Sequence, residues 1–147
     1  MKNKICTILL IMIISLLALF EVYSKFNVNN RKIEKRLKDV SAYRLGKVKD
    51  IFNIDYDKVY SITSVKNKQE IEDYIKVKNR HIKDNKKGET SIIFMKNKKI
   101  VAYLHGDKEN NGYYISIQEG EFLREYIENK NFTSKVIKNY MYYSIDD

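Results

Sequence analysis

The chain has few residues of the kinds that cross-link a fold or interrupt regular structure. Its 147 residues include one cysteine, five glycines and no proline. A single cysteine excludes an intrachain disulfide, so the fold must rest on packing alone. Cys6 lies at the start of the apolar segment described below, whereas a lipoprotein cysteine would follow that segment. We therefore interpret Cys6 as a small apolar residue within a helix.

Motifs for catalysis or cofactor binding are also missing. No G-x-S-x-G, G-x-x-x-x-G-K or G-x-G-x-x-G pattern occurs. The chain therefore lacks the usual motifs of serine hydrolases and of phosphate-binding loops. The two histidines, His81 and His105, have no second ligand at a metal-binding spacing. We therefore expect no catalytic residue, no metal and no cofactor, and a protein that is not an enzyme.

The N-terminal stretch carries the clearest pattern. Residues 5–20 form a run of sixteen residues without a charge, preceded by Lys2 and Lys4 and followed by Glu21. This arrangement is typical of a signal anchor or a signal peptide, and a helix of this length reaches about 24 Å across a ~30 Å hydrocarbon core. We expect residues 1–24 to form an uncleaved single-pass anchor in the cell membrane. The alternatives are a cleaved signal, which would make the protein secreted, and a helix buried in a soluble protein. The expected membrane segment includes Ile5, Leu9, Ile13, Leu17, Phe20 and Tyr23.

The basic residues on either side of this segment bear on its orientation. Two lysines precede it and six lysines or arginines follow it within residues 25–38, which under the positive-inside rule favours a cytoplasmic domain. Long domains that follow a signal-like start are, however, translocated largely regardless of charge. We therefore expect the C-terminal domain on the extracytoplasmic side.

A net charge of +9 raises the question of a polyanionic partner. The abundance of lysine, asparagine, isoleucine and tyrosine is also typical of translation from an AT-rich genome, which would explain the charge without any partner. The candidates for polyanion contact lie in a basic helix and a basic loop: Arg31, Lys32, Lys35, Arg36, Arg80, Lys83, Lys86 and Lys87. Nucleic acid is disfavoured, because the nearest base-stacking candidates, Tyr140 and Tyr142, fit the core face of a strand equally well.

Residues 25–52 are expected to form a basic, amphipathic helical connector. A polar tether is expected at residues 25–30, with a helix directly after it. A second, short helical turn is expected at residues 48–52. Apolar residues spaced four and three apart share one face of the first helix: Ile33, Leu37 and Val40. We expect this face to pack on the domain's own sheet.

Residues 53–147 are expected to form one α+β domain with a mostly antiparallel sheet of four or five strands and two or three helices. Asn67 and Glu70 have the spacing of a capping box and predict the start of a helix. Two apolar runs joined by a lysine-rich turn predict a hairpin, with a third strand of the same sheet after it. The expected strands are residues 55–63, 91–95, 100–104, 113–117 and 135–145, and the expected helices are residues 67–77 and 119–131.

Part of this domain resembles a known group of proteins. The run Asp-Tyr-Asp-Lys-Val-Tyr at residues 55–60, the capped helix and the hairpin IIFMKNKKIVAYL resemble small uncharacterised exported or lipoprotein-like proteins of Gram-positive bacteria. The resemblance implies an envelope-facing location and an α+β fold, and it implies no activity. It would single out Asp55, Asp57 and Lys58, and this chain departs from it at Tyr56, where tryptophan is expected.

These observations lead to two functional hypotheses. The first is a membrane-anchored, extracytoplasmic, non-catalytic binding or interaction domain, with an envelope protein or an anionic polymer as its candidate partner. The second is a cytoplasm-facing, membrane-anchored basic domain that binds anionic lipid or nucleic acid. Salt would separate them, because polyanion binding weakens steeply with salt and an interface built on aromatic anchors does not.

Overall fold

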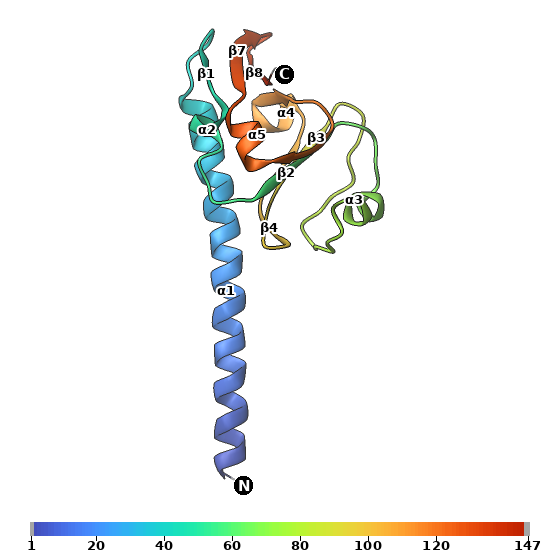
Figure 1. Ribbon diagram of the computed structural model, residues 1–147. Helices are drawn as coiled ribbons and strands as arrows, with labels where there is room; N and C mark the ends of the chain where they lie inside the picture. The colour runs from blue at the N-terminus through green and yellow to red at the C-terminus, as the bar shows by residue number, and fades with distance from the viewer. Residues whose placement is uncertain (1, 146–147) are drawn as a thin grey trace.

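The computed structural model describes the backbone of residues 2–145 and the side chains of residues 8–17 and 27–145. A long N-terminal helix, α1 (Lys2–Asp39), projects from a small domain that packs around its C-terminal part (Figure 1). The domain has α+β architecture, as expected. Its elements after α1 are, in chain order, β1 (Leu45–Lys47), α2 (Val48–Ile51), β2 (Lys58–Ile62), α3 (Lys68–Ile75), β3 (Thr90–Lys96), β4 (Lys99–Gly106), α4 (Lys108–Asn111), β5 (Tyr113–Ser116), β6 (Gly120–Leu123), α5 (Arg124–Glu128), β7 (Asn131–Ile137) and β8 (Tyr140–Ile145).

The strands form two four-stranded sheets. The central sheet has the order β4-β3-β2-β6 and is antiparallel throughout. The C-terminal sheet has the order β1-β7-β8-β5, in which β5 and β8 are parallel. The expectation of one sheet of four or five strands is therefore wrong. The strand at residues 113–116 joins the C-terminal sheet instead of extending the hairpin, because its backbone pairs with β8.

Helix α1 is continuous through residues 25–30, where we expected a polar tether. No glycine or proline occurs in residues 2–39, so nothing in the local sequence breaks the helix. Asn29 donates its side-chain amide to the Val101 carbonyl (2.9 Å), and Asn30 accepts the Tyr103 backbone N–H (2.8 Å). These two asparagines of the expected tether instead bind α1 to β4.

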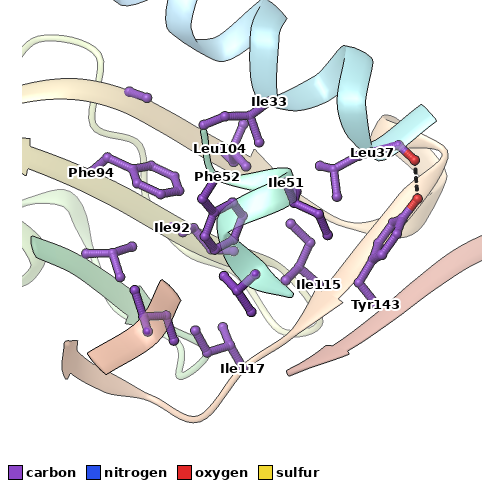
Figure 2. Close-up of a cluster of buried hydrophobic side chains, with 14 of the residues drawn as sticks. Ile33, Leu37, Ile51, Phe52, Ile92, Phe94, Leu104, Ile115, Ile117 and Tyr143 are labelled. Carbon is purple, nitrogen blue, oxygen red and sulfur yellow. Dashed lines mark hydrogen bonds between the residues drawn. The ribbon is translucent and has the colours of Figure 1, made fainter. Parts of the chain in front are cut away.

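Two apolar clusters cover the two faces of the central sheet. The first lies between that sheet, α1, α2 and the C-terminal sheet, and contains Ile33 and Leu37 of α1 (Figure 2). The second lies under α3 on the opposite face. Alternation along β3 sends Phe94 into the first cluster and Ile93 into the second. Because both faces are covered, β3 is buried along almost its whole length and shows no polar alternation in its sequence.

The face of α1 predicted from the spacing of its apolar residues is confirmed. Ile33 and Leu37 are 0% and 1% exposed, and burial of such a side chain contributes roughly 1.5–3 kcal/mol. The Tyr143 hydroxyl also donates a hydrogen bond to the Leu37 carbonyl (Figure 2). The C-terminal half of α1 is thus an integral part of the domain core.

The best-defined local predictions are also confirmed. Asn67 accepts the Glu70 backbone N–H (3.0 Å), and the Glu70 side chain accepts the Asn67 N–H (2.7 Å), which completes the capping box of α3. Strands β3 and β4 form the expected hairpin, with Asn97 and Lys98 at its turn in the left-handed backbone region.

Two C-terminal predictions are wrong in type. The helix expected at residues 119–131 is a strand, β6, followed by the short helix α5, because residues 120–123 pair with β2. The single strand expected at residues 135–145 is the end of β7, a two-residue turn and β8. Lys138 and Asn139 form that turn with φ values of 48° and 69°. Neither residue of this turn is a glycine, so the sequence lacks the usual signal of a two-residue hairpin turn.

Candidate functional sites

Residues 8–17 of α1 display apolar side chains around the whole circumference of the helix. Among residues 8–17, Leu9, Ile13 and Leu17 of the expected membrane segment are 53%, 52% and 62% exposed. The side chains of Ile5, Phe20 and Tyr23 lie outside the described residues. Successive residues of a helix turn by about 100°, so ten apolar or small residues in a row leave no polar face.

None of the helices, as far as their residues are described, has an apolar stretch long enough to span a membrane.

The predicted polyanion-contact residues form two separate groups. The α1 group lies on the helix that covers one face of the central sheet, and there Arg36 donates to the Asp50 carbonyl (2.8 Å). The loop group follows α3, where Ile82 packs on the opposite face. The central sheet separates the two groups, so they do not make one continuous binding surface. The exposed members are Arg31, Lys32, Lys35, Arg80, Lys83, Lys86 and Lys87.

A polar cavity of about 540 Å³ opens beside His105 at the end of β4. Its lining includes Lys83, Lys86, Glu89 and Asn111. The His105 Nε2 atom lies 3.7 Å from the Glu89 carboxylate, and both side chains are largely buried. Burial lowers the pKa of His105 below its usual value and outweighs the Glu89 carboxylate, which raises it.

The Ser91 hydroxyl links His105 to a buried polar network. It donates to Oδ1 of Asn85 (3.2 Å) and lies 3.2 Å from the Tyr103 hydroxyl. Because the one Ser91 proton goes to Asn85, the Tyr103 hydroxyl, which accepts the Lys83 N–H (3.4 Å), donates its own proton to Ser91. With its one proton donated to Asn85, Ser91 can only accept from Nδ1 of His105, at 3.0 Å. The network therefore assigns Nδ1–H to neutral His105 and leaves Nε2 as an acceptor that faces the cavity.

This assignment predicts the titration of His105. We expect a pKa below the ordinary value of a histidine, because burial disfavours the charged imidazole, and, in the neutral form, the Nδ1–H tautomer, both measured by ¹⁵N NMR of the imidazole. Because the folded state disfavours the charged form, the contribution of His105 to stability is complete above its unfolded pKa and is lost as the pH falls below it. Replacing Ser91 by alanine should shift the tautomer towards Nε2–H. A wild-type Nε2–H tautomer would contradict the network.

The grouping of Ser91, His105 and Glu89 has the residue types of a catalytic triad but not its accessibility. Ser91 is 0% exposed, and its oxygen is already surrounded by three hydrogen-bonding partners. A nucleophile must reach its substrate, so Ser91 is a structural residue here. The sequence contained no signal for this cluster, because its members come together only across the β3–β4 pairing and the loop before β3.

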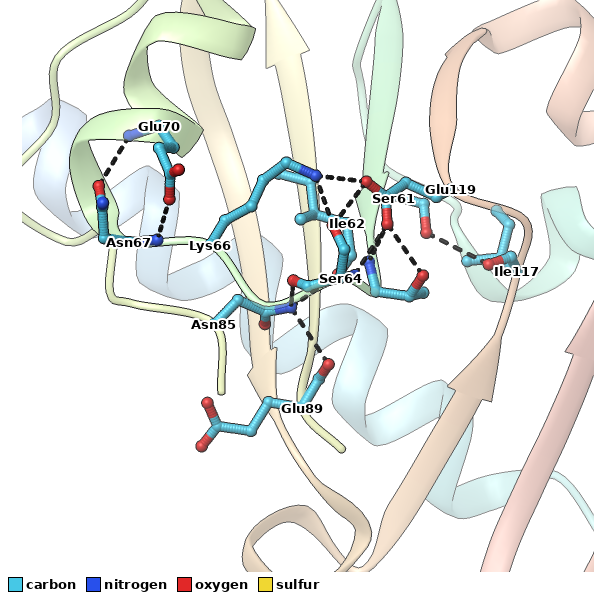
Figure 3. A network of polar contacts seen from close by, with 11 residues as sticks. Ser61, Ile62, Ser64, Lys66, Asn67, Glu70, Asn85, Glu89, Ile117 and Glu119 are labelled. Carbon is cyan, nitrogen blue, oxygen red and sulfur yellow. Dashed lines mark hydrogen bonds and ion pairs between the residues drawn. The ribbon is translucent and has the colours of Figure 1, made fainter. Parts of the chain in front are cut away.

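A second polar network joins the central sheet to the loop before β6 (Figure 3). The Glu119 carboxylate accepts hydrogen bonds from Ser64 N–H and Oγ–H (2.8 Å each) and from Lys66 Nζ (2.5 Å). Partial burial would raise the pKa of Glu119, but the hydrogen bonds from Lys66 and Ser64 outweigh it and lower the pKa to about 2. All of these oxygens are engaged within the chain, so we interpret the network as a support for the loop.

The residues singled out by the resemblance hold the β3–β4 hairpin in place. Asp55 forms ion pairs with Lys96 and Arg124. The Asp57 carboxylate accepts the Asn97 N–H (2.8 Å) in the hairpin turn. These carboxylates fix the hairpin turn to the segment that precedes β2.

An open cavity of about 590 Å³ lies beside these carboxylates, between the start of β2 and α5. Lys58 pairs with Glu121 (2.7 Å) on the neighbouring strand, and the buried ring of Tyr56 packs under the Arg124 guanidinium, 5.3 Å from the ring centroid. Burial raises the pKa of Tyr56, so its hydroxyl stays protonated. In the part of the chain that the structure describes, no three His, Cys, Asp or Glu residues are grouped to hold a metal ion.

Comparisons of the chain with protein-family models, with curated proteins and with solved structures found no match. The class of protein is therefore defined by its architecture: an α+β domain built around the end of a long helix whose other half is apolar.

Proposed function

We propose that this protein is a membrane-anchored, non-catalytic binding domain, with α1 as its anchor and the α+β domain on the extracytoplasmic side. One observation carries the proposal: the exposed apolar side chains of residues 8–17 cover every face of a helix that continues into the domain core. A helix that is apolar on all sides is stable when lipid or protein surrounds it. In water the same helix would expose an apolar surface far larger than that of ordinary soluble monomers.

The continuity of α1 defines what kind of anchor this is. Ile33 and Leu37 are buried in the domain, and the helix runs without interruption from them back through the apolar segment. A flexible linker would let a domain drift from the membrane, whereas a continuous helix holds it at a set height and angle. The domain should therefore present one constant face to the membrane and the opposite end to a partner.

A charge in the middle of the apolar segment tests the anchor. We expect the wild-type full chain to stay with membranes through an alkaline carbonate wash and to be released by detergent. Ile13→Arg should move most of the protein to the soluble or aggregated fraction, because an arginine at a bilayer centre costs about 2.5–3.5 kcal/mol. Val65→Arg, at a domain position that is 68% exposed, is the matched control and should stay membrane-bound.

Intact cells that express the full chain also report the orientation of the domain across the membrane. We expect protease added outside the cells to digest a C-terminal tag, and we expect the tagged product to have full length. Protection of the tag until lysis would contradict the extracytoplasmic placement. Loss of the wild-type chain in the carbonate wash would contradict the anchor itself.

A further inference from the structure

The tip of the β3–β4 hairpin lies beside α1 where the helix leaves the domain. Asn29 and Asn30 of α1 bind the main chain of β4 at Val101 and Tyr103. The earlier helix residue contacts the earlier strand residue, and Ile33 and Leu37 enter the core further along. Strand β4 therefore runs away from the N-terminal end of α1, and its beginning at Lys99 points towards that end.

The hairpin turn reaches the height at which the apolar segment of α1 ends. Three strand residues from Val101 back to Lys98 span about 10 Å, which equals roughly seven residues of an α-helix. Counted back from Asn29, the turn lies near helix residue 22, just after the uncharged residues 5–20. Figure 1 shows the same arrangement, with the β3–β4 turn and the segment after α3 as the parts of the domain nearest the N-terminal end of α1.

This end of the domain carries exposed lysines in the β3–β4 turn and in the segment after α3. Lys98 and Lys99 are exposed in the hairpin turn, and Lys76 and Lys78 are exposed directly after α3. The intervening Val77 packs against the cluster that contains Ile100, which brings the two elements together. We name these four lysines the membrane-side lysines.

Two carboxylates beside the β3–β4 turn are already engaged within the domain. Asp55 pairs with Lys96 and Arg124, Asp57 accepts the Asn97 N–H, and no ion pair of the described residues involves a membrane-side lysine. Lys76 also interacts electrostatically with the Glu121 carboxylate, and the positive charge of Lys78, Lys98 and Lys99 is thus left for an external anion.

We infer that the membrane-side lysines bind the anionic headgroups of phospholipids, so that the domain docks flat on the membrane that α1 enters. This inference rests on the proposed anchor. Lysines held near an anionic surface bind headgroups without any shaped pocket, because the attraction depends on charge and distance. Removal of each lysine should lower the ratio of docked to undocked domain about fivefold. Added salt should lower the same ratio, since it screens exposed charges.

The first experiment compares lysines within one molecule. The full chain, added to preformed vesicles, is acetylated with a lysine-directed reagent, and the rate at each lysine is read by mass spectrometry. One set of vesicles is pure phosphatidylcholine, and the other contains about one part in three phosphatidylglycerol. Lys98 and Lys99 should react several-fold more slowly on the anionic vesicles, and high salt should remove the difference. Lys135 and Lys138, exposed at the far β7–β8 turn, should react equally on both.

A matched pair of variants tests the cause. Lys98 and Lys138 both lie in two-residue turns in the left-handed backbone region, Lys98 as the second residue (φ 61°) and Lys138 as the first (φ 48°), and asparagine is well tolerated there. Lys98→Asn with Lys99→Gln should abolish the protection of Lys78 on anionic vesicles, whereas Lys138→Asn with Lys135→Gln should leave it unchanged. Retention of folding is checked by the circular dichroism of both variants.

The outcomes separate the inference from the proposal beneath it. If the wild-type chain does not float with neutral vesicles, the anchor fails and the inference falls with it. If the chain floats with both vesicle types but Lys98 and Lys99 react equally on each, the anchor stands and the headgroup contact is overturned. Equal protection of all exposed lysines on anionic vesicles would also overturn it, because that result requires no defined docking face.

Discussion

Replacing Phe94 by alanine is expected to lower the free energy of unfolding of the domain by about 3–5 kcal/mol. Phe94 is 0% exposed in the middle of β3. Its ring meets Phe52 edge to face at 4.9 Å and Tyr56 at 5.2 Å between centroids. The substitution removes most of a large side chain from the cluster that joins α1, α2 and both sheets, and backbone pairing on both sides of β3 limits collapse of the cavity.

The measurement is urea unfolding of the detergent-solubilised full chain, followed by the near-ultraviolet circular dichroism of its tyrosines. Val65→Ala serves as the control, because Val65 is 68% exposed and its truncation should change stability by less than about 0.5 kcal/mol. A similar loss for Phe94→Ala and Val65→Ala would contradict the packing of the first apolar cluster.

Replacing Asn85 by alanine is expected to lower the free energy of unfolding by about 2–4 kcal/mol, although the substitution removes a side chain from a loop and no apolar contact. Asn85 is 1% exposed, and its amide lies 2.8 Å from the Ser64 carbonyl and 3.2 Å from those of Ile62 and Glu89 (Figure 3). Its side-chain oxygen accepts the Ser91 hydroxyl. Alanine would leave these groups buried without their partner, which is more costly than the loss of an exposed hydrogen bond.

An aspartate at position 85 sharpens the test. It keeps the shape of asparagine and the acceptor for Ser91 but loses both donors and places a negative charge among carbonyl oxygens, so it should destabilise at least as much as alanine. Asn110→Ala, at an exposed position of α4, should be nearly neutral. If Asn85→Asp were as stable as the wild type, the assigned direction of the hydrogen bonds would be wrong.

Predictions that depended on short-range chemistry were confirmed by the structure. The capping box of α3 needs only Asn67 and Glu70 three residues apart, and both partners lie within one turn. The β3–β4 hairpin needs two apolar runs and a short connection between them. The buried face of α1 follows from the spacing of Ile33 and Leu37. In each case neighbouring residues alone determine the result.

Predictions that required a choice between local and distant partners were wrong. Residues 119–131 have helical spacing, but residues 120–123 gain the hydrogen bonds of β2, which is remote in the sequence. The turn at Lys138 and Asn139 lacks glycine, and only the pairing of β7 with β8 holds those residues at positive φ. Tertiary contacts overrode the local preference in both places.

The α+β class, the helix α3 and the β3–β4 hairpin could be predicted from the sequence, as could the uncharged run at residues 5–20, because these features depend on spacing along one segment. The division of the strands into two sheets and the unbroken continuation of α1 into the core could not be predicted in this way. Tertiary contacts also assemble the His105 network and bring β4 against α1. These features arise from contacts between residues distant in the sequence, and such contacts form only when the whole domain packs.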